Sequence, residues 1–133
     1  MLPGVYTAVK KDNTIYYRSN ITFSGKHISL GSFSTEEEAH LAYKEAESLL
    51  QGTTTLEEVL LTQESLSFEK KVTLLNFRDN RMYIGNPIYL QKNYFRYFLS
   101  PTEELKFDID DLFYYSSHKI LRRKGHLYVN DYG

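Results

Sequence analysis

The 133-residue sequence contains no cysteine and no tryptophan, and no apolar run in it is long enough to cross a membrane. Without cysteine, disulfides and cysteine zinc sites are excluded, and a membrane-spanning helix needs about 20 apolar residues. The N-terminal segment MLPGVYTAVKK lacks the long apolar core of a secretory signal peptide. We therefore expect a cytoplasmic protein that does not contact a membrane.

Neither sign of charge is in excess, because 16 lysines and arginines face 17 aspartates and glutamates, for a net charge of −1. Nucleic-acid-binding proteins are usually basic, so this balance does not by itself point to nucleic acid. Hydrophobic residues make up 41% of the chain, which is typical of a globular protein. The 12 tyrosines and 8 phenylalanines suit strands and interfaces, where a tyrosine can keep its hydroxyl wet.

The N-terminal segment reads as an antiparallel meander. Short runs rich in strand-forming residues occupy positions 5–9, 15–23 and 26–33. Between the second and third runs, Ser24-Gly25 is typical of a tight hairpin turn. Three short strands with short links are therefore predicted.

A helix is predicted after the third strand. Ser34 and Thr35 are both suitable N-caps, because a glutamate lies three residues beyond each of them. Gly52 is expected to end the helix. Apolar residues between these limits recur at spacings of three and four, which places them on one face. They are Ala39, Ala42, Tyr43, Ala46, Leu49 and Leu50.

The whole chain is predicted to be α+β, with a three-stranded antiparallel sheet packed on one α-helix (1–52), a linker with one further helical turn (53–65) and a small β-rich module (66–133). Asp110-Asp111 is expected to cap a short helix through Tyr115, and a turn is expected at 78–81. Strands of the second module are predicted at Val72–Phe77, Met82–Ile84, Ile88–Leu90, Tyr94–Leu99, Leu105–Ile109 and His126–Val129.

Residues 4–46 carry a further pattern. They contain Gly4-Val5 at the start, an aromatic-x-Ser-x-Ile run at Tyr17, Ser19 and Ile21, and the sequence LGSFST before a glutamate-rich stretch. These features resemble the DNA-binding domain of the APETALA-two (ethylene-response-factor) family, in the form found in bacterial and phage integrases and homing endonucleases. That family usually has alanine where this chain has Ser19. The resemblance implies a sheet on one helix and an origin in a phage or other mobile element.

Side chains alternate between the two faces of a strand, so one sheet face is expected to stay open, opposite the helix. In the resembled family this face lies in the major groove of DNA. The resemblance implies that Arg18 reads guanine, Asn20 reads adenine and Lys10 contacts a phosphate. The positions carried over are Tyr6, Ala8, Lys10, Tyr16, Arg18, Asn20, Thr22, His27 and Ser29.

The open face departs from the family pattern in its charge. Family members place several arginines there, whereas this chain offers Arg18 alone, with Lys10, Lys11 and Lys26 at the strand ends. A solvated or protein-binding sheet is therefore the alternative for this face.

A second basic patch lies close to the C-terminus, beside several tyrosines. Basic residues mixed with aromatic rings suit contacts to nucleic-acid phosphates and bases, and a solvated hairpin tip is the alternative. The patch consists of Lys119, Arg122, Arg123 and Lys124.

No sequence pattern indicates a catalytic or metal site. Asp108, Asp110 and Asp111 do not have the spacing of a calcium loop, and a helix cap is the commoner role for such residues. His118 and His126 have no cysteine or third histidine nearby. The stretch FDIDDLFYYSSHKILRRKGHLYV faintly resembles a segment that precedes the catalytic motif of HNH homing endonucleases, but the His-Asn-His motif is absent from the sequence. We expect no enzyme activity, no metal and no cofactor.

The sequence leaves two functions open. The first is a small DNA-binding protein that contacts double-stranded DNA through the N-terminal sheet, with the C-terminal module serving homodimerisation or a partner. The second is a protein-binding inhibitor of a host defence nuclease, similar to an anti-CRISPR protein, that reuses this fold. DNA requires a locally positive surface, and a protein partner does not.

Overall fold

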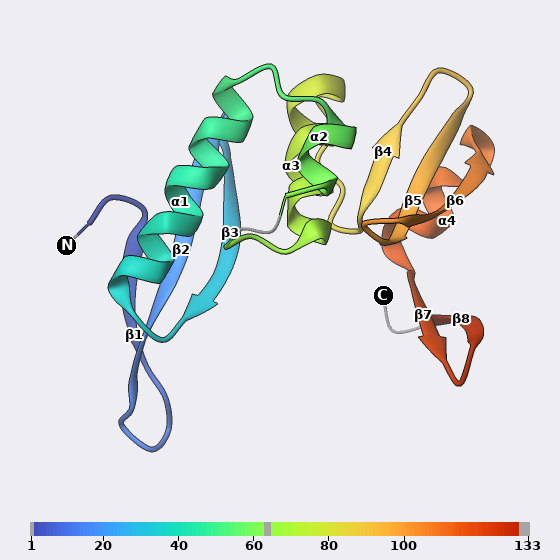
Figure 1. Cartoon of the computed structure of the whole chain (residues 1–133). Coiled ribbons are helices and arrows are strands. Elements are labelled where there is room, and N and C mark those ends of the chain that lie inside the picture. Colours follow the sequence, from blue (N-terminus) through green and yellow to red (C-terminus); the bar gives the residue numbers. More distant parts are fainter. Residues whose placement is uncertain (1, 63–64, 131–133) are drawn as a thin grey trace. The chain divides into compact units, whose positions relative to one another are not determined.

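The computed structural model describes residues 2–62 and 65–130, which form two compact units (Figure 1). The N-terminal unit comprises residues 2–54 and 65–67, and the C-terminal unit comprises residues 55–62 and 68–130. The fold class is α+β, as predicted, with a three-stranded sheet and a helix followed by a further β-rich part. In the part of the chain that the structure describes, no helix combines the length and the apolar character that crossing a membrane requires.

Three antiparallel strands form the sheet of the N-terminal unit, in the order β1-β2-β3. They are β1 (Val5–Val9), β2 (Ile15–Phe23) and β3 (Lys26–Phe33). Ser24 and Gly25 have φ angles of 49° and 78°, and positive φ at both central residues identifies a type I′ turn. The predicted meander and its tight hairpin are confirmed.

Helix α1 (Glu36–Gln51) follows β3 and has Thr35 as its N-cap. The Thr35 hydroxyl accepts a hydrogen bond from the backbone N–H of Glu38 at 3.1 Å and lies 3.0 Å from the Glu38 carboxylate, to which it donates. Of the two N-caps that the sequence offers, Thr35 is therefore the one that forms. Gly52 ends the helix, as predicted.

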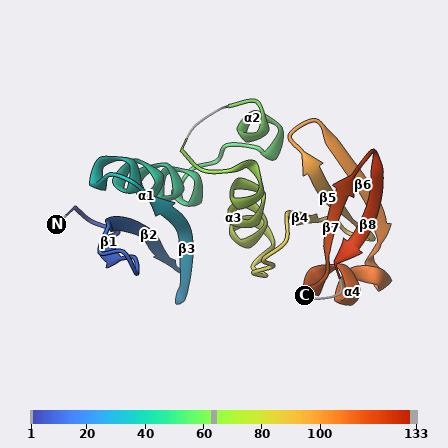
Figure 2. The same cartoon turned by 90° about the horizontal axis from the view of Figure 1, so that it is seen from below.

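The buried face of α1 is built largely from alanine. Ala39, Ala42 and Ala46 are each 0% exposed, and their small side chains let the helix lie close to all three strands. Figure 2 shows α1 lying across one face of the sheet, and within the described N-terminal unit no helix lies on the other face. The strands contribute buried Val5, Ile21, Ile28 and Leu30 to this core.

The pairing of β2 with β3 contains one β-bulge. The register passes from the pair Ser19–Gly31 to the pair Asn20–Ser29, so Leu30 is the extra residue. Gly31 has a φ of +122°, a conformation that favours glycine. Beyond the bulge, the alternation of side chains along β3 is reversed.

The segment before β1 is held against both the sheet and the helix. The Gly4 carbonyl accepts a hydrogen bond from the Asn20 backbone N–H at 2.9 Å, and His40 Nδ1 lies 3.0 Å from the Pro3 carbonyl oxygen. Gly4 has a φ of +77°, and a Cβ at this position would collide with the Tyr43 ring. Glycine at position 4 is therefore required by backbone conformation and by space.

The C-terminal unit combines helices with two small antiparallel sheets, one of order β4-β5-β6 and one formed by the hairpin β7-β8. Its elements are α2 (Leu56–Leu60), α3 (Phe68–Asn80), β4 (Ile88–Leu90), β5 (Tyr94–Ser100), β6 (Glu103–Asp108), the 3-10 helix η1 (Ile109–Asp111), α4 (Leu112–Ser117), β7 (Lys119–Arg123) and β8 (His126–Asn130). One core cluster consists of Ile84, Ile88, Phe95, Tyr97 and Ile120.

Helix α3 occupies the segment where the sequence predicts a strand at Val72–Phe77, and residues 82–84 form no strand. Both strand predictions are wrong. Residues 71–76 are all buried, although Lys71, Thr73 and Asn76 among them are polar. The polar residues therefore mark no exposed face from which a helical period could be read, and a short segment of this kind looks like a buried strand. The turn predicted at 78–81 is also wrong in its first part, because α3 continues to Asn80.

The strands predicted at Ile88–Leu90, Tyr94–Leu99 and His126–Val129 are confirmed, with ends that differ by no more than one residue. The strand predicted at Leu105–Ile109 corresponds to β6, which begins two residues earlier and ends one residue earlier. The interval 53–65, predicted as a linker with one helical turn, contains α2. The Thr55 hydroxyl caps this helix by accepting the Glu58 N–H at 3.3 Å.

The short helix after β6 forms, and Asp111 occupies the N-cap position of α4 as predicted, but the side-chain cap bond is made at the preceding 3-10 helix η1. Asp108 is the residue whose carboxylate accepts a hydrogen bond, from the Asp110 N–H at 2.9 Å, and Asp111 makes no side-chain cap bond. Because a 3-10 turn precedes the α-helix, the capping bond forms at the start of that turn, at Asp108.

Two buried or half-buried asparagines hold the C-terminal unit together. Asn76 accepts a hydrogen bond from the Leu90 N–H at 2.8 Å and donates one to the Met82 carbonyl at 2.9 Å. Asn86 donates to the carbonyl oxygens of Tyr115 and His118, at 2.9 and 3.1 Å. These side chains satisfy backbone groups that no regular ladder reaches.

Candidate nucleic-acid interface

Strand pairing places the candidate residues of the N-terminal sheet on one face. Residues directly opposite each other in an antiparallel pair lie on the same side of the sheet. The buried residues of β2 and β3 face α1, so the other set forms the open face, on the side of the sheet away from α1 in Figure 2. The pairs on the open face are Tyr6–Arg18, Ala8–Tyr16, Asn20–Ser29 and Thr22–His27.

Tyr16 organises the positive charge of this face. Arg18 Nη2 donates a hydrogen bond to the Tyr16 hydroxyl at 2.9 Å, and the Arg18 guanidinium carbon lies 5.6 Å from the centre of the Tyr16 ring. Lys10 Nζ lies 5.9 Å from the same ring centre, within the range of a cation–π contact. The candidate arginine and the candidate phosphate-binding lysine are thus gathered around one aromatic ring.

Polar groups continue along the same face toward the β2–β3 turn. The Thr22 hydroxyl and His27 Nδ1 form a hydrogen bond of 2.9 Å, which orients the imidazole across the hairpin. A hollow of about 250 Å³ lies at the sheet edge beside them. It is lined by Gly4, Tyr6, Asn20, Ile21, Thr22, His27 and Tyr43.

Charge is segregated between the two layers of the N-terminal unit. Residues 4–33, which form the sheet and its turns, contain four lysines or arginines and one aspartate. Residues 36–51, which form α1, contain five glutamates and one lysine. The sheet layer is therefore positive although the whole chain has a net charge of −1, and the acidic helix lies on the face away from the candidate residues.

Ser32 also belongs to the open face, and the sequence reasoning missed it. Strict alternation from Leu30 would place Ser32 toward the helix, but the bulge reverses the alternation and pairs Ser32 with Arg18. The one sequence signal for this is Gly31 within a strand, because an isolated glycine in a strand often marks a bulge.

No family model matches the chain, and neither a curated protein nor a solved structure is significantly similar to it. The APETALA-two and HNH resemblances therefore stay predictions. The case for a function rests on the geometry and the charge of this chain's own residues.

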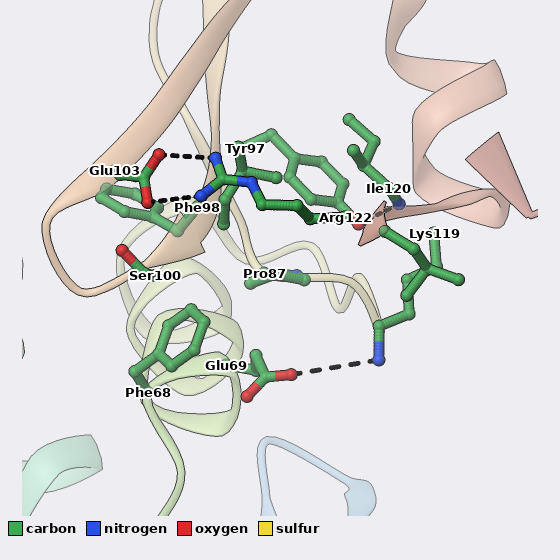
Figure 3. A pocket seen from close by; sticks show the side chains of 12 residues that line it. Phe68, Glu69, Pro87, Tyr97, Phe98, Ser100, Glu103, Lys119, Ile120 and Arg122 are labelled. Atoms are coloured by element: carbon green, nitrogen blue, oxygen red, sulfur yellow. Dashed lines mark hydrogen bonds and ion pairs between the residues drawn. The ribbon is translucent and has the colours of Figure 1, made fainter. Parts of the chain in front are cut away.

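The second basic patch is partly neutralised within the C-terminal unit. Arg122 forms two hydrogen bonds to the Glu103 carboxylate, of 2.6 and 3.0 Å, and Lys119 Nζ lies 4.0 Å from a Glu69 carboxylate oxygen (Figure 3). The bond from Arg122 lowers the pKa of Glu103 below its ordinary value. These pairs border a cavity of about 300 Å³ whose lining includes the buried ring of Tyr97.

The aspartates and histidines near β6 and α4 make local contacts within the C-terminal unit. Among the described residues, no group of three or more histidine, cysteine, aspartate or glutamate side chains is arranged to hold a metal ion. Asp108 caps η1, and the His118 ring stacks on Tyr114 with ring centres 4.1 Å apart. The exposed His126 pairs with Arg123 at the end of the β7–β8 hairpin.

Proposed function

We propose that this chain is a small DNA-binding protein without catalytic activity, which contacts the major groove of double-stranded DNA through the open face of the β1–β3 sheet. The observation that carries the proposal is the separation of charge and polarity: polar and basic side chains gather on the uncovered sheet face, and the glutamates of α1 lie on the opposite layer. A β-sheet element fits the major groove, which is about 12 Å wide.

Each open-face residue has a role in this proposal. Arg18 donates two hydrogen bonds to guanine, and Asn20 pairs in the same two-point manner with adenine. Lys10, at the end of β1, contacts a backbone phosphate. The remaining polar members are expected to provide further contacts, and they are Tyr6, Tyr16, Thr22, His27, Ser29 and Ser32.

The resemblance to the APETALA-two family supports this division of labour, since that family also places the open face in the major groove. It also supports an origin in a phage or other mobile element. A cytoplasmic site of action, which the sequence predicts independently of the resemblance, belongs to the proposal as well. These points are part of the proposal.

Binding of labelled duplexes tests the proposal. Arg18→Ala and Asn20→Ala are each expected to weaken binding to the preferred sequence by about 1–3 kcal/mol, the usual discrimination from a good two-point base contact. Lys10→Ala is expected to weaken binding to all sequences alike, because a phosphate carries no sequence information. The matched control is Lys44→Ala, which removes the same charge from exposed α1 and is expected to have a smaller effect than Lys10→Ala.

A second candidate is favoured by one observation. Tyr6, Val9 and Ile15 are 54%, 60% and 55% exposed, and Val9 pairs with Ile15 at the far end of the β1–β2 hairpin. Exposed apolar side chains on a sheet suit a protein partner. The second candidate is therefore the protein-binding alternative that the sequence leaves open, an inhibitor of a host defence nuclease.

The two candidates respond differently to the same substitutions. If the partner is a protein, Tyr6→Ala and Tyr16→Ala are expected to be the most damaging changes, because buried tyrosines dominate many protein interfaces, and Arg18→Ala is expected to matter less. Loss of duplex binding in Arg18→Ala with little effect in Tyr6→Ala supports DNA. The reverse order, with no duplex binding by the unmodified chain, supports the inhibitor.

A further inference from the structure

The β7–β8 hairpin carries positive charge without compensating acid in its own sequence. Residues 112–130 contain four lysines or arginines and no aspartate or glutamate. Lys124 and Gly125 have φ angles of 51° and 80°, which identify a type I′ turn. Arg123 and His126 therefore lie directly opposite each other at the turn.

The cations of the hairpin divide into two pairs with different surroundings. Lys119 and Arg122 lie beside acids of the same unit, as Figure 3 shows. Arg123 and Lys124 are exposed, and neither forms an ion pair with another described residue. The charge that is available to a ligand is thus concentrated at the turn, where His126 adds an imidazole group that is also exposed.

We propose that the tip of this hairpin, formed by Arg123, Lys124 and His126, is a second DNA-contact surface, which binds the phosphate backbone of duplex DNA without reading its sequence. Backbone phosphates accept hydrogen bonds from clustered cationic donors, and such contacts position a protein without selecting a base. This surface belongs to the C-terminal unit and does not depend on the role of the β1–β3 sheet.

The aromatic content of the hairpin favours a duplex over a single strand. Proteins that hold single strands stack successive bases on several rings. On the hairpin face that carries Arg123 and His126, the rings among the described residues of β7 and β8 are the His126 imidazole and Tyr128, which lies opposite Leu121. This face therefore offers charge and hydrogen-bond donors but no series of stacking platforms.

Arg122 acts as a positioning residue in this proposal. Its paired hydrogen bonds to Glu103 attach β7 to the first residue of β6, and so hold the hairpin against the rest of the unit. Because Glu103 occupies the guanidinium group, Arg122 is not free to bind a phosphate.

The test measures the affinity of the full chain for a short duplex of scrambled sequence at several salt concentrations between about 50 and 200 mM. The test variant is R123Q/K124N, which removes two charges and keeps the turn, because Asn-Gly is the preferred type I′ pair. The matched control is K92Q/K106Q, which removes two exposed charges from another part of the same unit. Circular dichroism spectra establish that both variants are folded.

The proposal predicts that R123Q/K124N reduces the slope of log affinity against log salt by about 1.8, since each phosphate contact contributes about 0.9 for duplex DNA. The control is expected to leave the slope nearly unchanged. Equal effects of the two variants would show that net charge alone matters, and would overturn the proposal.

Two further results would also overturn it. One is that R123Q/K124N loses affinity for single strands but not for duplexes. The other is that the unmodified chain has no affinity for any duplex at low salt. Failure of the sheet proposal gives a different result. In that case Arg18→Ala leaves sequence preference unchanged, while R123Q/K124N still reduces the salt slope.

Discussion

Ser19 provides the sharpest test of the packing in the N-terminal unit. Its side chain is 0% exposed between the sheet and α1, and its hydroxyl has no hydrogen-bond partner among the described residues. Ser19 is also the position where the APETALA-two family usually has alanine. Replacing it with alanine removes a buried polar group that makes no compensating bond.

The expected change in the free energy of unfolding for Ser19→Ala follows from two opposing contributions. Burying a hydroxyl without a hydrogen bond costs about 1–3 kcal/mol in proteins. Removing the oxygen leaves a void of roughly 10 Å³, which at about 24 cal/mol per Å³ costs only about 0.2 kcal/mol. Ser19→Ala is therefore expected to raise the free energy of unfolding by about 1–3 kcal/mol.

Urea denaturation followed by circular dichroism measures this change through the midpoint at constant slope. The control is Ser29→Ala, the same chemical change on the exposed face of the neighbouring strand, which is expected to stay within about 0.5 kcal/mol of the unmodified chain. A lower midpoint for Ser19→Ala would refute the reasoning, because it would mean that the hydroxyl makes a favourable bond in the folded protein.

Three further changes probe the same structure. Ala46→Leu is expected to destabilise by about 1–3 kcal/mol through overpacking between α1 and the sheet, and an unchanged melting temperature would show that this face is not buried. Gly4→Ala is expected to destabilise more than Gly25→Ala, because both have positive φ but only the first Cβ collides with Tyr43; equal losses would exclude the collision. Burial, and then a hydrogen bond to a carboxylate, raise the pKa of Tyr89 from 10.0 to about 12, so its contribution to stability is complete below pH 10 and is lost as pH rises toward 12. Between pH 10 and 12, the free energy of unfolding of Tyr89→Phe is expected to fall less than that of the unmodified chain. An equal fall in both proteins would contradict the raised pKa of Tyr89.

The N-terminal unit was predictable because its local signals agree with one another. The strand runs, the Ser24-Gly25 turn and the spacing of the alanines all indicate the same fold, and the structure has that fold. The exceptions are the bulge and the consequent position of Ser32. A bulge depends on how two strands pair, which alternation along one strand does not reveal.

The C-terminal unit was harder to predict because its signals conflict. Residues 71–76 are buried on all sides of α3, so periodicity does not distinguish a helix from a strand there. Asn76 and Asn86 bond to backbone groups up to 32 residues away, and no local pattern announces such contacts. Elements bounded by clear turns, such as β4, β5 and β8, were nevertheless located correctly.

The candidate site was predictable in its membership but not in its internal contacts. Alternation placed Tyr16, Arg18 and Asn20 on one face, and strand pairing agrees. The arrangement of Lys10 and Arg18 around the Tyr16 ring depends on side-chain conformation. The ion pair of Arg122 with Glu103 also depends on side-chain conformation. This ion pair separates Arg122 from the cations of the second basic patch that form no ion pair with another described residue.

The most direct test of the central claim is an amide NMR titration of the nitrogen-labelled chain with duplex DNA. We expect that, within the N-terminal unit, the signals that change are those of open-face residues such as Arg18, Asn20 and His27, while those of Lys44 and Glu47 on α1 stay in place. The changes are expected to weaken as salt increases, since counterion release drives the binding. If no signal of the β1–β3 sheet changes at low salt, or if the changes are confined to α1, the open face is not a DNA-binding surface.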